Sequence, residues 1–176
     1  MGTIRQDQTP IGRELSFSDS ISCSGDGSER RISVIPIEPK HFFEVASTVQ
    51  QDQILDALTI SSQNVEDAIR EGFDGYTVLG KGGEVIACIG VRECGEGHGH
   101  SWAMFAESSR GKLFSIHKHV SRYLRDSGYS TIWADVRESY GDGHRWAKLL
   151  GFKSVSVEED YYEDGTNAVM YRRDRI

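Results

Sequence analysis

The sequence has no apolar run long enough to cross a membrane. A transmembrane helix needs roughly 18 or more consecutive apolar residues, and no stretch of the chain approaches that length. The start, MGTIRQDQTPIGRELSF, also lacks the apolar segment of a secretion signal. We therefore expect a soluble protein that works in the cytoplasm.

Cysteine and positive charge are both scarce. The three cysteines, Cys23, Cys88 and Cys94, are an odd number at no metal-binding spacing, so we expect reduced thiols. The chain carries 20 Lys and Arg against 27 Asp and Glu, which gives a net charge of −7. Because binding to a phosphate backbone needs clustered basic side chains, this balance argues against a nucleic-acid partner.

Six histidines are the remaining candidates for a metal site. His98 and His100 lie in one predicted loop at the start of a strand, whereas His117 and His119 share a predicted helix. Residues two apart on a helix do not face each other, and no cysteine or carboxylate lies at ligand spacing. The sequence therefore predicts no metal.

Proline is confined to the first 39 residues, at Pro10, Pro36 and Pro39. Residues 18–30, SDSISCSGDGSER, are rich in Ser and Gly and have no hydrophobic periodicity, which is typical of disorder. We expect an extended N-terminal arm over 1–30 and one domain over 31–176. Two interpretations of the arm remain open: a disordered tail, or a segment that docks on a partner protein through TPIGRELSF.

Hydrophobic periodicity is present from residue 31 onward. Alternating or β-branched runs predict strands, and intervals of three and four residues predict helices. We expect strands over residues 31–39, 75–79, 84–94, 100–108, 130–138, 152–160 and 168–174, and helices over 40–60, 61–73, 111–128 and 142–150. This order predicts an α/β fold, with a mixed central sheet of about seven strands and helices on both faces.

The stretch WAKLLGF, residues 146–152, predicts how a helix ends. Gly151 can take the left-handed conformation that stops the helix, and Phe152 then enters the core as the next strand begins. Together with the order of elements and the spacing from Val136 to Tyr140, this stretch resembles the GNAT superfamily of N-acetyltransferases over about residues 31–173. The resemblance implies the GNAT fold, with acetyl-CoA as a possible cofactor.

The resemblance also implies a cofactor-binding turn before the long helix. Members of the superfamily bind the pyrophosphate of acetyl-CoA with backbone N–H groups at this helix start. The sequence pattern of this turn is Gln/Arg-x-x-Gly-x-Gly/Ala. Here the turn reads SRGKLFS. The candidate acetyl-CoA-binding residues are therefore Ser109, Arg110, Gly111, Lys112 and Ser115.

Three positions depart from the family pattern. Leu113 occupies the position of the glycine, Tyr140 that of an asparagine, and Ala147 that of the usual tyrosine general acid. An active enzyme needs a base for the amine and an acid for the leaving thiolate. Glu107, at the end of the predicted fourth strand, is the candidate base, with Glu93 as a second choice. Tyr140 is the candidate acid.

The predicted turn between the last two strands, VEEDYYEDG (157–165), carries five carboxylates. A solvated turn explains them. The functional alternative is an acidic rim that attracts amine substrates or a basic partner.

Two functions remain open. Trp102 on the fourth strand, together with RWAKLLGF, also resembles a GNAT-like group encoded by podophages, the internal virion protein A group, whose members serve virion assembly. With the three departures, this resemblance favours a GNAT-fold binding or assembly protein. It would be a phage virion component with a degenerate acetyl-CoA groove and protein partners reached through residues 1–30, incorporated from the host cytoplasm. The alternative is an acetyl-CoA-dependent N-acetyltransferase that acts on an amine.

Overall fold

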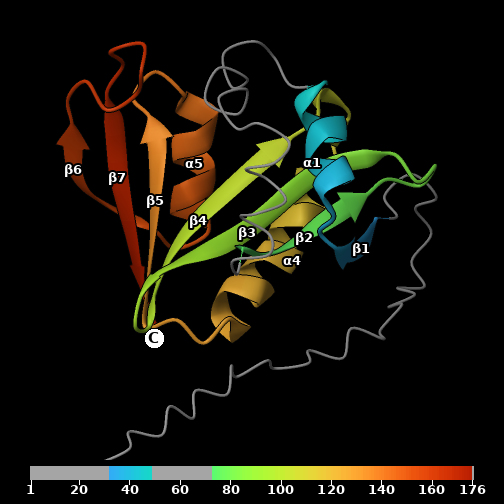
Figure 1. Cartoon of the computed structure of the whole chain (residues 1–176), viewed down its shortest axis with the longest axis horizontal. Coiled ribbons are helices and arrows are strands. Elements are labelled where there is room, and N and C mark those ends of the chain that lie inside the picture. The colour runs from blue at the N-terminus through green and yellow to red at the C-terminus, as the bar shows by residue number, and fades with distance from the viewer. Residues whose placement is uncertain (1–31, 49–72, 176) are drawn as a thin grey trace, which may run out of the picture.

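The computed structural model describes residues 32–48 and 73–175 (Figure 1). The predicted arm over 1–30, with its docking role, lies outside the described residues. So do most of the first predicted helix and nearly all of the second. Within the described part, no helix combines the length and the apolar character needed to span a membrane.

Seven strands form one mixed sheet in the order β1-β2-β3-β4-β5-β7-β6. In the described sheet all neighbours run antiparallel except β4 and β5, which are parallel. The strands are β1 (Ser33–Pro36), β2 (Phe73–Leu79), β3 (Val85–Gly95), β4 (His98–Phe105), β5 (Thr131–Arg137), β6 (Lys153–Glu158) and β7 (Ala168–Asp174). The prediction of an α/β fold with a seven-stranded mixed sheet is confirmed.

Helices cover both faces of this sheet (Figure 1). α1 (Pro39–Ala46) packs on one face, and α4 (Leu113–Asp126) and α5 (Gly141–Leu149) pack on the other. Proline suits the first position of α1 because its φ is already helical. Nδ1 of His41 accepts the N–H of Glu38 at 3.2 Å and lies 3.1 Å from the hydroxyl of Thr77 on β2, which ties α1 to the sheet.

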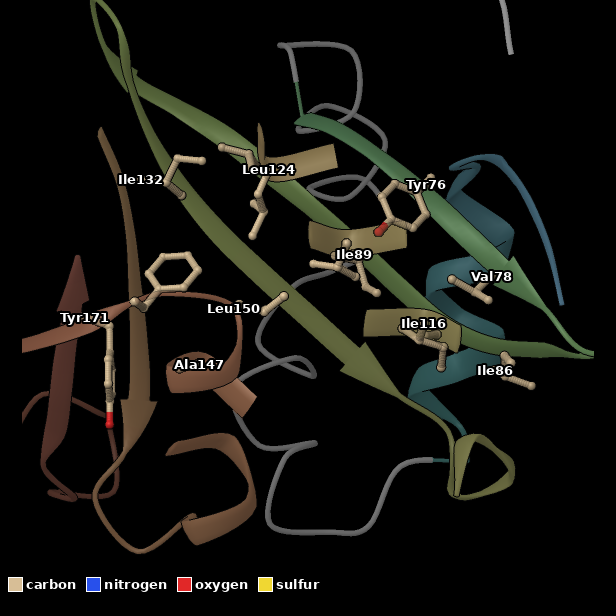
Figure 2. Close-up of a cluster of buried hydrophobic side chains, with 14 residues drawn as sticks. Tyr76, Val78, Ile86, Ile89, Ile116, Leu124, Ile132, Ala147, Leu150 and Tyr171 are labelled. Carbon is tan, nitrogen blue, oxygen red and sulfur yellow. The ribbon is translucent and has the colours of Figure 1, made fainter. Parts of the chain in front are cut away.

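The larger of two apolar clusters lies under α4 and α5 (Figure 2). Ile116, Val120 and Leu124 form one stripe of α4 and are at most 4 % exposed, as the helical spacing requires. Figure 2 shows the side chains that they meet on the sheet, among them Tyr76, Val78, Ile86, Ile89 and Ile132. The smaller cluster lies under α1 and consists of Val45, Val85, Cys88 and Ala106.

The helix end predicted from LLGF has the geometry of a Schellman motif. Gly151 has a φ of +87°, and its N–H donates to the carbonyl oxygen of Lys148 at 3.0 Å. The N–H of Phe152 donates to the carbonyl oxygen of Ala147 at 3.1 Å. Phe152 is 4 % exposed in the larger cluster. α5 therefore passes almost directly into β6, the edge strand next to β7.

Candidate active site

The parallel strands β4 and β5 pair only along their first residues. Pairing ends at His100 and Trp133, where the hydroxyl of Ser101 also donates a hydrogen bond to the carbonyl oxygen of Trp133 at 3.1 Å. Beyond this point the two strands continue without pairing to each other, and Figure 1 shows them diverging. We call this part, residues 101–105 of β4 and 134–137 of β5, the splay.

The splay presents two strand edges at the carboxyl ends of parallel strands. β4 pairs with β3, and β5 pairs with β7, on the sides that face away from the splay. The peptide groups on the inner edges therefore have no strand partner within the described sheet. Ligands of open α/β sheets bind outside the carboxyl ends of their strands, and unpaired strand edges bind extended chains through their peptide groups. An extended ligand that carries amides suits this opening.

α5 packs against β5 beside the splay (Figure 1). Ala103 and Phe105 of β4, and Ala134 and Val136 of β5, pack against the larger cluster on this face. The rings of Phe105 and Trp146 meet edge to face, with 4.9 Å between their centroids. The indole N–H of Trp146 is buried and has no hydrogen-bond partner among the described residues. An unsatisfied buried donor of this kind is costly to the folded state.

Beyond β4 the chain passes through the 3₁₀ turn η1 (Glu107–Ser109) into α4. The backbone N–H groups of Gly111, Leu113 and Phe114 donate no hydrogen bond to any described residue, as is usual at the start of a helix. Gly111 has a φ of +82°, and nothing lies within 4 Å of the position that a Cβ would occupy. Open N–H groups at the positive end of a helix dipole suit a phosphate group.

Two cations flank this turn, and they are held differently. The side chain of Arg110 is 71 % exposed, and its guanidinium lies 3.7 Å from the carboxylate of Glu107. The ammonium group of Lys112 lies 3.1 Å from the carboxylate of Glu84, and the Lys112 side chain is only 19 % exposed. Glu84 also accepts the N–H of Gly82 at 2.9 Å. Arg110 is therefore the cation with the greater freedom to meet a bound anion.

The remaining candidate residues lie in the same turn. Ser109 is buried, and its N–H donates to the carbonyl oxygen of Ala106 at 2.9 Å. Ser115 is half-buried in the first turn of α4, and its N–H donates to the carbonyl oxygen of Lys112 at 3.0 Å. The structure thus brings all five predicted acetyl-CoA-binding residues together, and their role as ligands stays a prediction.

The predicted base and acid lie outside the splay strands. The predicted end of the fourth strand at residue 108 is wrong, because the chain turns into η1 after Phe105. Glu107 therefore opens η1, where its side chain is 65 % exposed beside Arg110. Tyr140 precedes α5 and is 39 % exposed. Its ring lies so close to Gly143 that a Cβ there would be 2.4 Å from Cδ1.

Two departures from the family pattern have clear structural consequences. Leu113 is 45 % exposed at the first position of α4, so its side chain is not packed into the splay. Ala147 is buried in the larger cluster, so α5 offers no hydroxyl at the position of the family's usual acid. The turn at α4 therefore keeps its open N–H groups, whereas α5 lacks a hydroxyl at this position.

A network that the sequence analysis does not predict lies on the α1 side of the sheet, where the splay begins. Nε2 of His100 lies 3.1 Å from Oδ1 of Asp135, and the hydroxyl of Tyr162 donates to Oδ2 of Asp135 at 2.7 Å. Burial raises the pKa of Asp135, but the hydrogen bonds from His100 and Tyr162 outweigh burial, so the pKa lies below its ordinary value.

The one sequence signal for this network is a carboxylate in the middle of a strand. Asp135 stands in STIWADVRE between residues that face the core, and charged groups at such positions are usually paired. His100 lies 35 positions earlier, on the predicted fourth strand, and β4 begins two residues before the predicted start, at His98 rather than in a loop. Tyr162 lies 27 positions after Asp135. No local pattern connects residues so far apart.

No family model matches the sequence, and a search of curated proteins finds no match. Solved structures do match. A protein from Desulfovibrio desulfuricans assigned to the GNAT family of acetyltransferases superposes with a TM-score of 0.62 and 15 % sequence identity, over 82 % of this chain and 99 % of its own. The chain has the GNAT fold.

Two further solved structures of GNAT-fold proteins also superpose on this chain. Ard1 from Thermoplasma volcanium superposes with a TM-score of 0.68 and 18 % identity, over 82 % of this chain and 98 % of its own. The ribosomal-protein-S18-alanine N-acetyltransferase from Escherichia coli superposes with a TM-score of 0.66 and 14 % identity, over 82 % and 94 %. The predicted GNAT fold is confirmed, and likeness at these identities concerns the fold alone.

Proposed function

We propose that this chain is an acetyl-CoA-dependent N-acetyltransferase. The observation that carries the proposal is the β4–β5 splay, whose first strand leads through η1 to a helix start with open N–H groups. Neighbours of the same fold support this chemistry, since they are named for acetyl transfer to the alanine of ribosomal protein S18 and to spermidine or spermine. The comparisons thus favour the enzyme over the virion-assembly hypothesis, for which they offer no support.

The residues present fit acetyl-CoA. The open N–H groups of Gly111, Leu113 and Phe114 would hold its pyrophosphate, with the guanidinium of Arg110 beside them. The inner edges of β4 and β5 would bind the amides of the pantetheine arm. When bound, acetyl-CoA supplies an acetyl group activated as a thioester.

The chain's own residues must then move two protons. The attacking amine gives up a proton to a base, and the leaving thiolate takes one from an acid or from water. Tyr140 remains the candidate acid, because Ala147 supplies no hydroxyl. Glu107 remains a candidate base, although its exposed position beside Arg110 places it next to the anion-binding turn rather than within the splay.

Calorimetric titration with acetyl-CoA tests the binding step. We expect a dissociation constant in the micromolar range, about −8 kcal/mol, and competition by CoA, which shares the pyrophosphate and the pantetheine arm. Desulfo-CoA, which lacks only the thiol of CoA, is the matched probe for binding through the pyrophosphate and the pantetheine arm. Absence of measurable heat up to about 1 mM acetyl-CoA, a free energy weaker than about −4 kcal/mol, would contradict the proposal.

Mass spectrometry of the acceptor tests the transfer step. Spermidine and an alanine-initiated peptide are the two probes, because the structural neighbours are named for these acceptor classes. We expect one of them to gain an acetyl group only when protein and acetyl-CoA are both present. Tight acetyl-CoA binding without transfer to either probe would instead favour a binding protein that keeps the groove and has lost the reaction.

A further inference from the structure

A histidine–carboxylate pair lies where β4 and β5 part. His100 is the last β4 residue in register with β5, and Asp135 lies two residues beyond its register partner, Trp133. The side chain of Asp135 projects to the α1 side, since its strand neighbours Ala134 and Val136 pack in the cluster on the other face. His100 lies an odd number of residues from Ala103 and Phe105 of that cluster, so it projects to the α1 side as well. The 3.1 Å contact between them bridges the two strands at the start of the splay.

The contact determines which ring nitrogen of His100 carries the proton. An ionised carboxylate can only accept hydrogen bonds, so Nε2 donates to Asp135 and Nδ1 keeps its lone pair. Nδ1 makes no hydrogen bond with any residue of the described ranges. The side chain is 24 % exposed, which leaves it within reach of a bound molecule.

Asp135 is itself held in place from the last hairpin. The hydroxyl of Tyr162 occupies its second carboxylate oxygen at 2.7 Å. The guanidinium of Arg137 lies over the Tyr162 ring, 4.1 Å from the centroid, and pairs with Asp164 at 2.8 Å. The loop between β6 and β7 is thereby fixed to β5. The carboxylate that orients His100 therefore has little freedom to move.

We propose that His100 is the general base of the acetyl transfer and that Asp135 is the positioning residue that fixes its tautomer. This inference rests on the proposed function. The ammonium group of the acceptor gives one proton to Nδ1 of His100, and the neutral nitrogen then bonds to the thioester carbonyl carbon. The C–S bond breaks as the nitrogen loses its second proton, and Tyr140 or water passes a proton to the CoA thiolate that leaves. The products are the amide, CoA and an imidazolium next to Asp135, which returns its proton to solvent.

His100 suits this role better than Glu107. One nitrogen of its ring is held by Asp135 while the other can accept a proton, so the ring stays oriented as the proton moves. Its position at the opening of the splay also places it beside the unpaired strand edges. Glu107 lies past the end of β4, where it is largely exposed and paired with a guanidinium.

The charged and titratable groups around His100 favour a cationic amine as acceptor. Arg92 is its register partner on β3, and Asp135 faces it from β5. From the last hairpin come Tyr161 and Glu158. Burial raises the pKa of Tyr161, Asp135 and Glu158 raise it further, and Arg92 opposes them. Three carboxylates, Asp135, Glu158 and Asp164, against the two guanidinium groups of Arg92 and Arg137 leave this corner net negative, which attracts a protonated amine.

The experiment compares His100→Gln with His98→Gln, an exposed histidine of the same strand. Rates are measured against pH with acetyl-CoA and whichever probe, spermidine or the alanine-initiated peptide, is acetylated. We expect His100→Gln to lower kcat about 100-fold or more at neutral pH, with acetyl-CoA affinity by calorimetry unchanged. The loss should shrink toward pH 10, where more of the amine arrives without its proton. His98→Gln should retain the unaltered rate and pH profile.

A second readout needs neither turnover nor a stable variant at position 100. Nitrogen NMR of histidine-labelled protein reports the ring tautomer, and the unaltered chain should show His100 with its proton on Nε2. In the same NMR measurement, Asp135→Asn should lose this single tautomer. In the separate activity measurement, Asp135→Asn should lose part of kcat. A proton on Nδ1 in the unaltered chain overturns the inference.

The two proposals fail in different ways. If the unaltered protein acetylates neither probe, the proposed function is overturned and the base assignment with it. If the unaltered protein is active and His100→Gln keeps more than about a third of kcat at neutral pH, well short of the loss expected for a general base, only the base assignment is overturned.

Discussion

The ammonium group of Lys112 lies 3.1 Å from the carboxylate of Glu84, a contact that ties the residue before α4 to the β2–β3 hairpin. Its charge is thereby balanced within the protein. Arg110, two residues earlier, is largely exposed and makes only a 3.7 Å contact with Glu107. The two basic residues of SRGK therefore differ in what they can offer an anion.

Arg110→Ala should weaken acetyl-CoA binding more than Lys112→Ala does. We expect a loss of about fivefold for Arg110, about 1 kcal/mol, which is typical of an exposed charge contact. The loss for Lys112 should be smaller, because its charge already serves Glu84. Calorimetric titration measures both variants. Arg125→Ala, in the last turn of the same helix, is the control and should bind as the unaltered protein does. A larger loss for Lys112 would contradict the assignment.

Gly111→Ala and Gly141→Ala should change stability in opposite directions. At Gly111 the φ of +82° is strained for alanine, so we expect a loss of about 1–2 kcal/mol although the surroundings are open. At Gly141, the first residue of α5, the surroundings are also open but the backbone is helical. There alanine should stabilise by about 0.5 kcal/mol. Urea unfolding of both variants measures the signs, and equal effects would reject the backbone explanation.

Leu149→Ala and Leu150→Ala should differ sharply, although the residues are neighbours in LLGF. Leu150 is 7 % exposed in the larger cluster, whereas Leu149 is 70 % exposed. We expect Leu150→Ala to cost about 2–5 kcal/mol, as for other buried leucines, and Leu149→Ala to change stability by less than about 0.5 kcal/mol. Thermal and urea unfolding give the comparison. A substantial cost at Leu149 would mean that another surface covers it.

Acid should destabilise the fold partly through Asp164. Hydrogen bonds from the hydroxyl and N–H of Thr166 and from Arg137 lower the pKa of Asp164 to about 2. A carboxylate with a lowered folded-state pKa stabilises above its ordinary pKa, near 3.9, and loses that contribution as pH falls toward 2. The lowered pKa of Asp135 acts in the same direction.

The test follows unfolding free energy between pH 5 and pH 2. Asp164→Asn should be less stable than the unaltered protein at pH 5, and the difference should shrink steadily toward pH 2. Asp126→Asn, an exposed aspartate at the end of α4, is the matched control and should show no such convergence. A gap for Asp164→Asn that stays constant with pH would show that the carboxylate's charge is not the cause.

Much of the fold could be predicted because the signals are local. The stripe of Ile116, Val120 and Leu124 predicts α4, and Gly151 with Phe152 predicts the end of α5, since spacing and backbone conformation are properties of neighbouring residues. The end of β4 was harder to predict. Ala106 continues the apolar run past Phe105, and the 3₁₀ turn that follows depends on hydrogen bonds within the folded chain.

By itself the sequence determined the order of the strands and helices within the described residues, the GNAT-like path of the chain and the turn from Ser109 to Ser115, because periodicity and turn chemistry act over a few residues. Only the tertiary structure decided where β4 and β5 part, that Leu113 stays exposed, and that His100 meets Asp135. Those relationships join residues brought together by sheet pairing, and the contacts that define them do not exist until the sheet has formed.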